Sequence, residues 1–159
     1  MSRRDRNPET LFAAALEGDR SALARLLSMI EQGGDDARTV GRLSYPLGGH
    51  SYTVGLTGAP GAGKSTLTSS IIGHLRKMDL EVAVLAIDPS SPFTGGAILG
   101  DRVRMQDHAT DRGVFIRSMA TRGHLGGLSL AAPEAIRLLD AIGRLWVLVE
   151  TVGGGQVAV

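Results

Sequence analysis

One stretch of the sequence has the residue types and the spacing that bind phosphate groups. It fits the pattern G-x-x-x-x-G-K-[ST] at every fixed position and consists of Gly58, Ala59, Pro60, Gly61, Ala62, Gly63, Lys64 and Ser65. Glycines let the backbone curve closely around a phosphate, so that several N–H groups point inward. Lys64 is placed to reach the β and γ phosphates, the Ser65 hydroxyl to ligate Mg²⁺, and Thr66 to donate to a phosphate. The pattern predicts a nucleoside triphosphate site, the alternative being a glycine-rich turn with an incidental lysine.

Two aspartates follow at positions where they could serve the same site. Asp88 comes directly after the apolar run VAVLAI, and a carboxylate at the carboxyl end of a parallel strand faces the ligand crevice. We expect Asp88 to bind Mg²⁺ or to position water, the alternative being a turn or capping aspartate. Asp101 follows Gly100 at the start of a segment that could be helical, where composition alone favours a helix cap.

A third acid, Glu150, ends another apolar run, and Gly153 follows it three residues later. This spacing is that of the D-x-x-G pattern of GTPases, with a glutamate that is one methylene longer than the usual aspartate. In that pattern the acid addresses Mg²⁺ or the attacking water, and the glycine N–H contacts the γ-phosphate. The alternative is a solvated glutamate at the end of a strand, and the rule for ligand sites at strand ends favours the functional interpretation.

Alternating strands and helices are predicted to position these residues. Strands are expected at residues 52–57, 82–87, 114–117 and 146–149, and helices at 65–77 and 131–142. Such alternation indicates a mostly parallel α/β sheet flanked by helices, as in P-loop NTPases. The strand at 52–57 is expected to be buried and to run straight into the glycine loop. It should also lie beside the strand at 146–149, near the centre of the sheet.

The N-terminal third of the chain is predicted to be helical and to carry no chemical motif. Asn7 and Pro8 are typical of a helix start, and Asp19 can cap a second helix that runs to about Gln32. The sequence thus predicts a helical appendage over residues 1–50, for packing or dimerisation, and a P-loop domain over residues 51–159.

Composition narrows the class of protein further. The chain has 159 residues, a net charge of +1, 43% hydrophobic residues and no cysteine. These values are typical of a globular domain without disulfides, thiolate metal sites or a general attraction to nucleic acid. No apolar run reaches the roughly 18 residues of a membrane span. We therefore expect a cytoplasmic protein.

Four strings together resemble one family of GTPases. They are VGLTGAPGAGKSTLTSSI, VLAIDPSSPFTGGAILGDRVRM, FIRSMATRGHLGGLS and VLVETVGGGQ. In this order they are similar to the MeaB/ArgK-type P-loop GTPases, relatives of the methylmalonic aciduria type A protein, over roughly residues 10–157. The resemblance implies a homodimeric, Mg²⁺-dependent GTPase with GTP and GDP as its nucleotides. It also implies a chaperone that gates adenosylcobalamin loading of methylmalonyl-CoA mutase, or a related mutase, and protects that enzyme.

The resemblance also assigns roles to individual residues. It implies that Lys64, Ser65 and Thr66 hold phosphate and Mg²⁺. Asp88 and Asp101 would lie at the two ends of the first switch and serve the metal and the water, which moves Asp101 from a cap to a site residue. Glu150 would begin the second switch.

Two departures from the family pattern affect what we expect of this chain. Gly154 stands where the family has valine, and no guanine-reading [NT]-K-x-D string is present. Lys77-Met78-Asp79 mimics part of that string, but Arg76 precedes it and it closes the helix after the P-loop. The family's later strands and dimerisation helices are also absent, so we expect an incomplete sheet and weak or no GTP turnover by these residues alone. An ATP-dependent kinase or transport-associated ATPase, and a non-catalytic remnant, stay open as alternatives.

Overall fold

The structure is a computed structural model that describes residues 7–59, 61–88, 108, 110–120 and 131–151. Its contacts divide the chain into two compact units. The helical unit contains residues 1–51 and 131–143, and the sheet unit contains residues 52–130 and 144–159. Three predicted site residues, Pro60, Asp101 and Gly153, lie outside the described residues.

The helical unit is built from the N-terminal helices and one helix from later in the chain. Its elements are α1 (Pro8–Leu16), α2 (Arg20–Gln32), α3 (Gly34–Ser44), the 3-10 turn η1 (Tyr45–Leu47) and α7 (Ala132–Ala141). Both predicted caps are confirmed. The Asn7 side chain accepts from the N–H of Thr10 at 2.9 Å, and Asp19 accepts from the N–H groups of Ser21 and Ala22. These bonds satisfy amides that a helix start leaves without partners.

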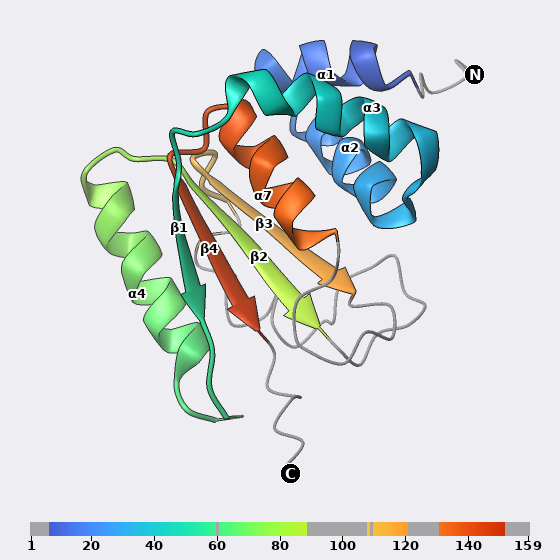
Figure 1. Cartoon of the computed structure of the whole chain (residues 1–159). Helices are drawn as coiled ribbons and strands as arrows, with labels where there is room; N and C mark the ends of the chain where they lie inside the picture. The colour runs from blue at the N-terminus through green and yellow to red at the C-terminus, as the bar shows by residue number, and fades with distance from the viewer. Residues whose placement is uncertain (1–6, 60, 89–107, 109, 121–130, 152–159) are drawn as a thin grey trace, which may run out of the picture. The chain divides into compact units, whose positions relative to one another are not determined.

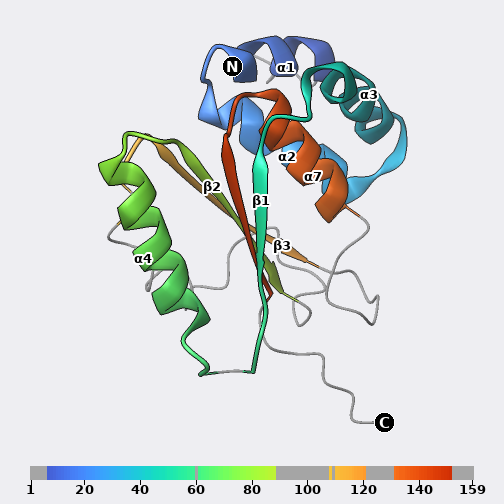
Figure 2. The same cartoon turned by 60° about the vertical axis from the view of Figure 1, so that its left-hand side comes forward.

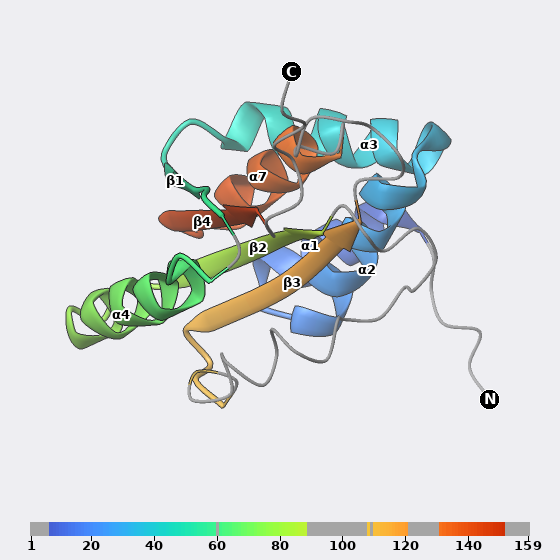
Figure 3. The same cartoon turned by 90° about the horizontal axis from the view of Figure 1, so that it is seen from below.

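Helix α3 was not predicted, because it carries little apolar signal. Only Val40 and Ser44 are buried in it, and it contains Gly41, a residue that disfavours helix interiors. The glycine has a packing reason, since a Cβ at Gly41 would lie 3.2 Å from a carboxylate oxygen of Glu134 on α7. Figure 3 shows α3 alongside α7, in keeping with their contacts. The division into domains at residue 50 stays a prediction. By contact, α7 groups with the N-terminal helices, so the helical unit also contains a segment from later in the chain.

Asp140 fastens α7 to the segment that follows η1. Its carboxylate accepts from the backbone N–H groups of Gly49, His50 and Ser51, the last at 2.9 Å. Charge-assisted bonds of this kind are about twice as strong as bonds between neutral groups. One side chain therefore fixes three consecutive residues just before the first strand begins.

The sheet unit contains four parallel strands and one described helix (Figure 1). The strands are β1 (Tyr52–Leu56), β2 (Val82–Asp88), β3 (Val114–Ala120) and β4 (Trp146–Thr151), and the helix is α4 (Lys64–Lys77). The order β1-β4-β2-β3 makes β1 and β4 neighbours, as predicted. Helix α4 contacts β2 and β4, and Figure 2 shows it along one face of the sheet. None of the helices in the described residues has the length and apolar character that crossing a membrane requires.

The core of the sheet unit lies between α4 and the inner strands. Residues 82–87 are all buried, so β2 is covered on both faces as its continuous apolar run predicted. In this core, Ile72 and Leu75 of α4 pack against strand side chains, which are Leu56, Val82, Val84, Val114 and Leu148. Burial of this apolar surface holds α4, and with it the loop before α4, on the sheet.

The expectation that β1 is a buried strand is wrong. Tyr52 is 61% exposed, Thr53 and Gly55 are exposed, and only Leu56 is buried. The physical reason is its place in the sheet, because β1 is the outermost of the four described strands and pairs with β4 alone. Tyr52 stacks on Trp146 of β4, with 5.1 Å between ring centroids, which covers part of the apolar edge.

A charged cluster fastens the end of α4 that lies far from the glycine loop. Arg76 donates to the Asp111 carboxylate and to the Leu80 carbonyl, both at 2.9 Å. The N–H of Gly113 donates to the other oxygen of Asp111. A Cβ at Gly113 would lie 2.2 Å from the guanidinium carbon of Arg76, so a glycine lets the chain pass this close to the ion pair. The cluster ties α4 to the start of β3.

Candidate nucleotide-binding site

The loop between β1 and α4 has the backbone conformation that a phosphate-binding loop needs. Gly58, Gly61 and Gly63 have φ angles of 150°, 77° and 88°. These values lie in the region that residues with a side chain rarely adopt. A Cβ placed on Gly61 or Gly63 would meet no atom within 4 Å, so open space adjoins the loop at both positions. The loop can therefore bring its backbone close to a bound group.

The start of α4 leaves its amides available to such a group. Among the described residues no side chain caps this helix, whose first turn also lacks an acidic residue. The opposite end carries His74, Arg76 and Lys77, which complement the negative end of the helix dipole. Free N–H groups and the positive end of the dipole together favour an anion at the start of the helix.

Lys64 supplies a cation at the same point. Its ammonium donates to the carbonyl oxygens of Gly58 and Ala59, at 2.9 and 3.0 Å. Both acceptors are neutral, and no described carboxylate pairs with the ammonium, so no described group neutralises its charge beside the loop. This is the arrangement expected of a side chain that binds phosphate oxygens.

Glu150 provides the matching negative group. Its side chain is buried, with 3% of the residue exposed, and both oxygens accept hydrogen bonds from α4. The Ser65 hydroxyl donates to Oε1 at 2.7 Å, and the Thr68 hydroxyl donates to Oε2 at 3.0 Å. In the part of the chain that the structure describes, no lysine, arginine or histidine pairs with this carboxylate. Hydroxyl and carboxylate oxygens are the ligands that Mg²⁺ prefers, so the donor set fits that ion.

The sheet register explains why these residues meet. Parallel strands place their carboxyl ends at the same edge, and Leu56 of β1 pairs directly with Glu150 of β4. Gly58 follows Leu56 by two residues, so the loop begins beside Glu150. The Thr151 hydroxyl also contacts the hydroxyl of Thr57 at 3.2 Å, which joins the ends of the two strands.

The other predicted site residues fall into two groups. Asp88 is the last residue of β2, two positions beyond Ala86, which pairs with Glu150, so its backbone lies at the same edge of the sheet. Thr66 is exposed in the first turn of α4. The structure thus brings Ser65 into contact with Glu150, and Lys64 into contact with the glycine loop, whereas Pro60, Asp101 and Gly153 lie outside the described residues. Thr68 was not predicted as a site residue, although its spacing from Ser65 places it on the same side of the helix.

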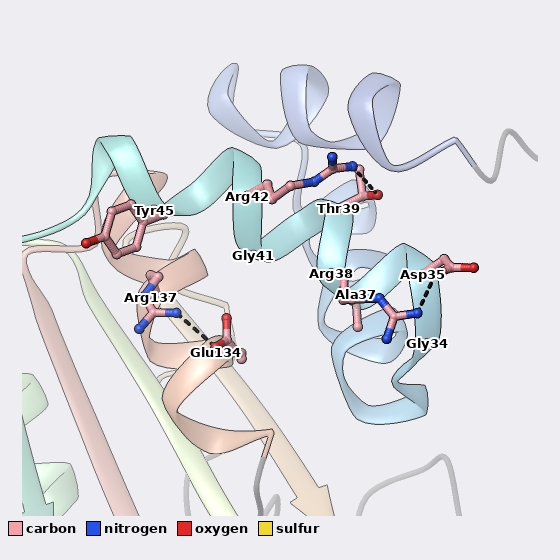
Figure 4. Close-up of a pocket in the computed structure, with 10 residues that line it drawn as sticks. All are labelled: Gly34, Asp35, Ala37, Arg38, Thr39, Gly41, Arg42, Tyr45, Glu134 and Arg137. Atoms are coloured by element: carbon pink, nitrogen blue, oxygen red, sulfur yellow. Dashed lines mark hydrogen bonds and ion pairs between the residues drawn. The ribbon is translucent and has the colours of Figure 1, made fainter.

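A second hollow lies within the helical unit, between α3 and α7 (Figure 4). Its volume is about 970 Å³, and arginines dominate its polar lining. These charges already have partners, since Arg38 pairs with Asp35 and Arg137 with Glu134, while Arg42 donates to a threonine hydroxyl. The hollow offers no nucleophile beside a base. The loop before α4 is therefore the stronger candidate for chemistry.

Comparison with known proteins identifies the family of the chain. The family model described as methylmalonyl Co-A mutase-associated GTPase MeaB matches residues 23–159. A Pyrococcus abyssi protein is 60% identical over 151 residues, which are 95% of this chain and 47% of that protein. The GTPase ArgK of Escherichia coli is 42% identical over 144 residues, or 88% of this chain and 44% of ArgK.

A solved structure shares the fold. The crystal structure of a LAO/AO transport system kinase matches 98% of this chain and 46% of that chain, with a TM-score of 0.72 and 27% sequence identity. The chain spans a little under half the length of the relatives that it matches. The family match covers most of the chain, including the glycine loop, α4 and the strand of Glu150. The chain therefore belongs to the MeaB family of methylmalonyl-CoA mutase-associated GTPases.

Proposed function

We propose that this chain binds GTP with Mg²⁺ through the loop before α4 and takes part in GTP hydrolysis. The observation that carries the proposal is the contact between Ser65 and Glu150, 2.7 Å long, at the uncapped start of α4. It joins the hydroxyl that the P-loop pattern assigns to Mg²⁺ with a strand-end carboxylate, next to a cation and free amides. Family membership supports the guanine nucleotide.

Each residue has a role that follows from its chemistry. Lys64 would leave the carbonyls of Gly58 and Ala59 and donate to phosphate oxygens, which carry a full charge and therefore bind it more strongly. Ser65 would present the lone pairs of its hydroxyl oxygen to Mg²⁺, while the hydroxyl proton keeps its hydrogen bond to Glu150. Thr66 would donate to a phosphate from the first turn of the helix.

Catalysis by this site would rest on positioning and on charge. When bound, Mg²⁺ neutralises charge on the β and γ phosphates. Glu150 would order the hydroxyl of Ser65 and a water at the metal. Asp88 is proposed for the metal and Asp101 for the metal and the attacking water. The N–H of Gly153 is proposed to contact the γ-phosphate, as in the D-x-x-G pattern.

The preference for guanine over adenine rests on family membership alone. Among the described residues, no contact reads the base. The kinase alternative draws on the description of the solved neighbour as a transport system kinase. Competition between GTP and ATP for a bound fluorescent GDP analogue separates the two. A chain carried to the length of its relatives should release the analogue to GTP at a concentration at least tenfold lower than to ATP. Equal competition by ATP would favour the kinase or ATPase interpretation.

The proposed partner is a cobalamin-dependent mutase of the methylmalonyl-CoA type. The name of the family model supports this, as does a 35% identical Caenorhabditis elegans protein described as a mitochondrial methylmalonic aciduria type A homolog. That match covers 96% of this chain and 42% of that protein. We propose that the chain acts in the cytoplasm as part of a homodimeric chaperone that gates adenosylcobalamin loading and protects the mutase. Nucleotide-dependent co-elution with purified mutase tests the association, and the same elution profile with and without GTP would argue against it.

A further inference from the structure

We infer that Thr68 is a positioning residue of the nucleotide site. Its hydroxyl holds one oxygen of Glu150 and thereby fixes the direction in which the other oxygen accepts from Ser65. This role rests on the proposed function, because it matters for Mg²⁺ only if Ser65 is a metal ligand. The motif that identifies the P-loop ends before Thr68, so this residue is a separate part of the site.

The geometry places Thr68 where it can do this. It is fully buried, and its hydroxyl oxygen lies 2.9 Å from the carbonyl oxygen of Lys64 and 3.0 Å from Oε2 of Glu150. Threonine in a helix divides between two side-chain rotamers, one of which bonds back to the preceding turn. In that rotamer the one hydroxyl proton of Thr68 has two acceptors within reach, the Lys64 carbonyl and Glu150, and the charged carboxylate is the stronger acceptor.

Two hydrogen bonds fix the rotation of the Glu150 carboxylate, which one hydrogen bond would leave free. A carboxylate held by Ser65 alone could rotate about its terminal bond, since such sp³–sp² torsions are broad. Thr68 lies one helical turn after Ser65, so a single rigid element holds both oxygens of Glu150. The orientation of the carboxylate then determines where the Ser65 proton points, and hence where the Ser65 lone pairs point.

The chemistry of the two donors is also informative. Hydroxyl groups orient the carboxylate without neutralising it, whereas an arginine or lysine would compensate its charge. A buried acid that is bound by two neutral donors keeps its negative charge available for a cation beside Ser65. The longer side chain of glutamate, compared with the aspartate of the usual GTPase pattern, gives it the reach to contact two successive turns of α4.

A purely structural role for Thr68 makes a different prediction. If its hydroxyl only satisfies a buried oxygen, its removal should destabilise the fold and leave the Mg²⁺ dependence of nucleotide binding unchanged. If Thr68 positions Glu150, its removal should weaken the coupling between Mg²⁺ and nucleotide in the folded protein.

The experiment compares Thr68→Val with the parent chain, with Thr68→Ser and with Ser70→Ala. Ser70 is a matched control, because its hydroxyl also bonds back along α4, to the Thr66 carbonyl at 3.0 Å, with no contact to Glu150. The affinity for a fluorescent GDP analogue is measured with Mg²⁺ and with EDTA. The ratio of the two dissociation constants gives the coupling between metal and nucleotide.

We expect Thr68→Val to reduce this ratio by about tenfold, the factor that corresponds to one hydrogen bond to a charged group. Its affinity in EDTA should stay within about twofold of the parent, because among the described residues the Thr68 hydroxyl bonds to Glu150 and to the Lys64 carbonyl, and not to the glycine loop before Lys64. Thr68→Ser should restore most of the ratio, and Ser70→Ala should match the parent. An unchanged ratio in Thr68→Val, with the parent binding normally, would overturn the role of Thr68 alone. A parent that binds the analogue equally with and without Mg²⁺ would overturn the proposed function, and the role of Thr68 with it.

A second measurement does not depend on nucleotide. Urea unfolding of the parent, Thr68→Val, Glu150→Gln and the double variant forms a double-mutant cycle. Direct contact predicts that the double variant is less impaired than the sum of the single variants. Additive effects in this cycle would show that the two side chains do not interact, and would overturn the inference even if the valine variant binds nucleotide poorly.

Discussion

The two ends of helix α4 hold charged groups in different ways. At the end that starts at Lys64, the carboxylate of Glu150 accepts, among the described residues, from the hydroxyls of Ser65 and Thr68. At the end that finishes at Lys77, the guanidinium of Arg76 is matched by the opposite charge of Asp111 and by the Leu80 carbonyl. The first end of α4 thus orients an acid of β4 whose charge no described cation compensates, whereas the other end carries a base whose charge is neutralised.

This difference distinguishes a candidate binding site, at the Lys64 end, from a structural ion pair, at the Arg76 end. An ion pair that satisfies both partners has little capacity left for a ligand, and it fixes the start of β3 against the helix. At the other end, Lys64 is bound by neutral acceptors and Glu150 by neutral donors, and no ion pair joins the two among the described residues. In the proposed function, a metal–phosphate group would bind to both. The predictions below change one end at a time.

The largest effect is expected at the nucleotide end, on the rate of hydrolysis. Glu150→Gln keeps the shape of the side chain and removes its charge, which acts mainly on the metal and the water in the transition state. We expect kcat to fall by about 100-fold, the size seen when one transition-state hydrogen-bonding group is removed. The dissociation constant for the nucleotide in Mg²⁺ should rise by about tenfold, the size expected for Thr68→Val, so hydrolysis is slowed more than binding is weakened. Phosphate release is measured on a chain carried to the length of its relatives, and turnover equal to the parent would refute the assignment.

At the far end of α4, Arg76→Met should change stability and spare binding. The variant keeps most of the apolar stem and loses the bonds to Asp111 and Leu80. The free energy of unfolding in urea should fall by about 1–2 kcal/mol, the net value of one or two hydrogen bonds. Lys77→Met, one residue along the same helix and exposed, is the matched control and should cost less. If Arg76→Met weakened nucleotide binding as strongly as it weakened folding, the two ends could not be regarded as separate.

The smallest effect concerns how the stabilisation by the Arg76–Asp111 ion pair depends on pH. The hydrogen bond from Arg76, followed by that from the Gly113 N–H, lowers the pKa of Asp111, and the nearby His108 acts in the same direction. A carboxylate with a depressed folded pKa stabilises the protein fully above its unfolded pKa of about 3.9. That contribution is lost as the pH falls through the folded value. The stability difference between the parent and Asp111→Asn should therefore shrink as the pH falls from about 5 to below about 4. A difference that grows towards pH 3 would contradict this sign.

The sequence predicted the elements whose local residue pattern matches their burial and hydrogen bonding in the fold. The caps at Asn7 and Asp19 are local hydrogen-bonding patterns, and the apolar run of β2 lies at a position where both faces are buried. The meeting of the glycine loop with Glu150 was also predictable, because the rule for strand ends places both at one edge of a parallel sheet.

What the sequence could not predict depends on contacts between distant segments. Helix α3 has a polar composition, and its glycine is explained only by the approach of Glu134. The strand β1 has the composition of a buried strand, yet among the described strands it lies at the edge. Thr68 carries no motif, and its importance emerges only when the second oxygen of Glu150 is located in space.

The measurement that tests the central claim most directly is a titration of the chain with a fluorescent GTP analogue in Mg²⁺. Lys64→Ala removes the one side-chain cation of the loop, and Lys77→Ala removes the only other lysine of the chain as a matched control. Because charge-assisted hydrogen bonds contribute about 1.5–3 kcal/mol, Lys64→Ala should raise the dissociation constant by about tenfold or more. Lys77→Ala should bind like the parent. Equal affinity in the parent and in Lys64→Ala would contradict the assignment of the loop before α4 as the nucleotide site.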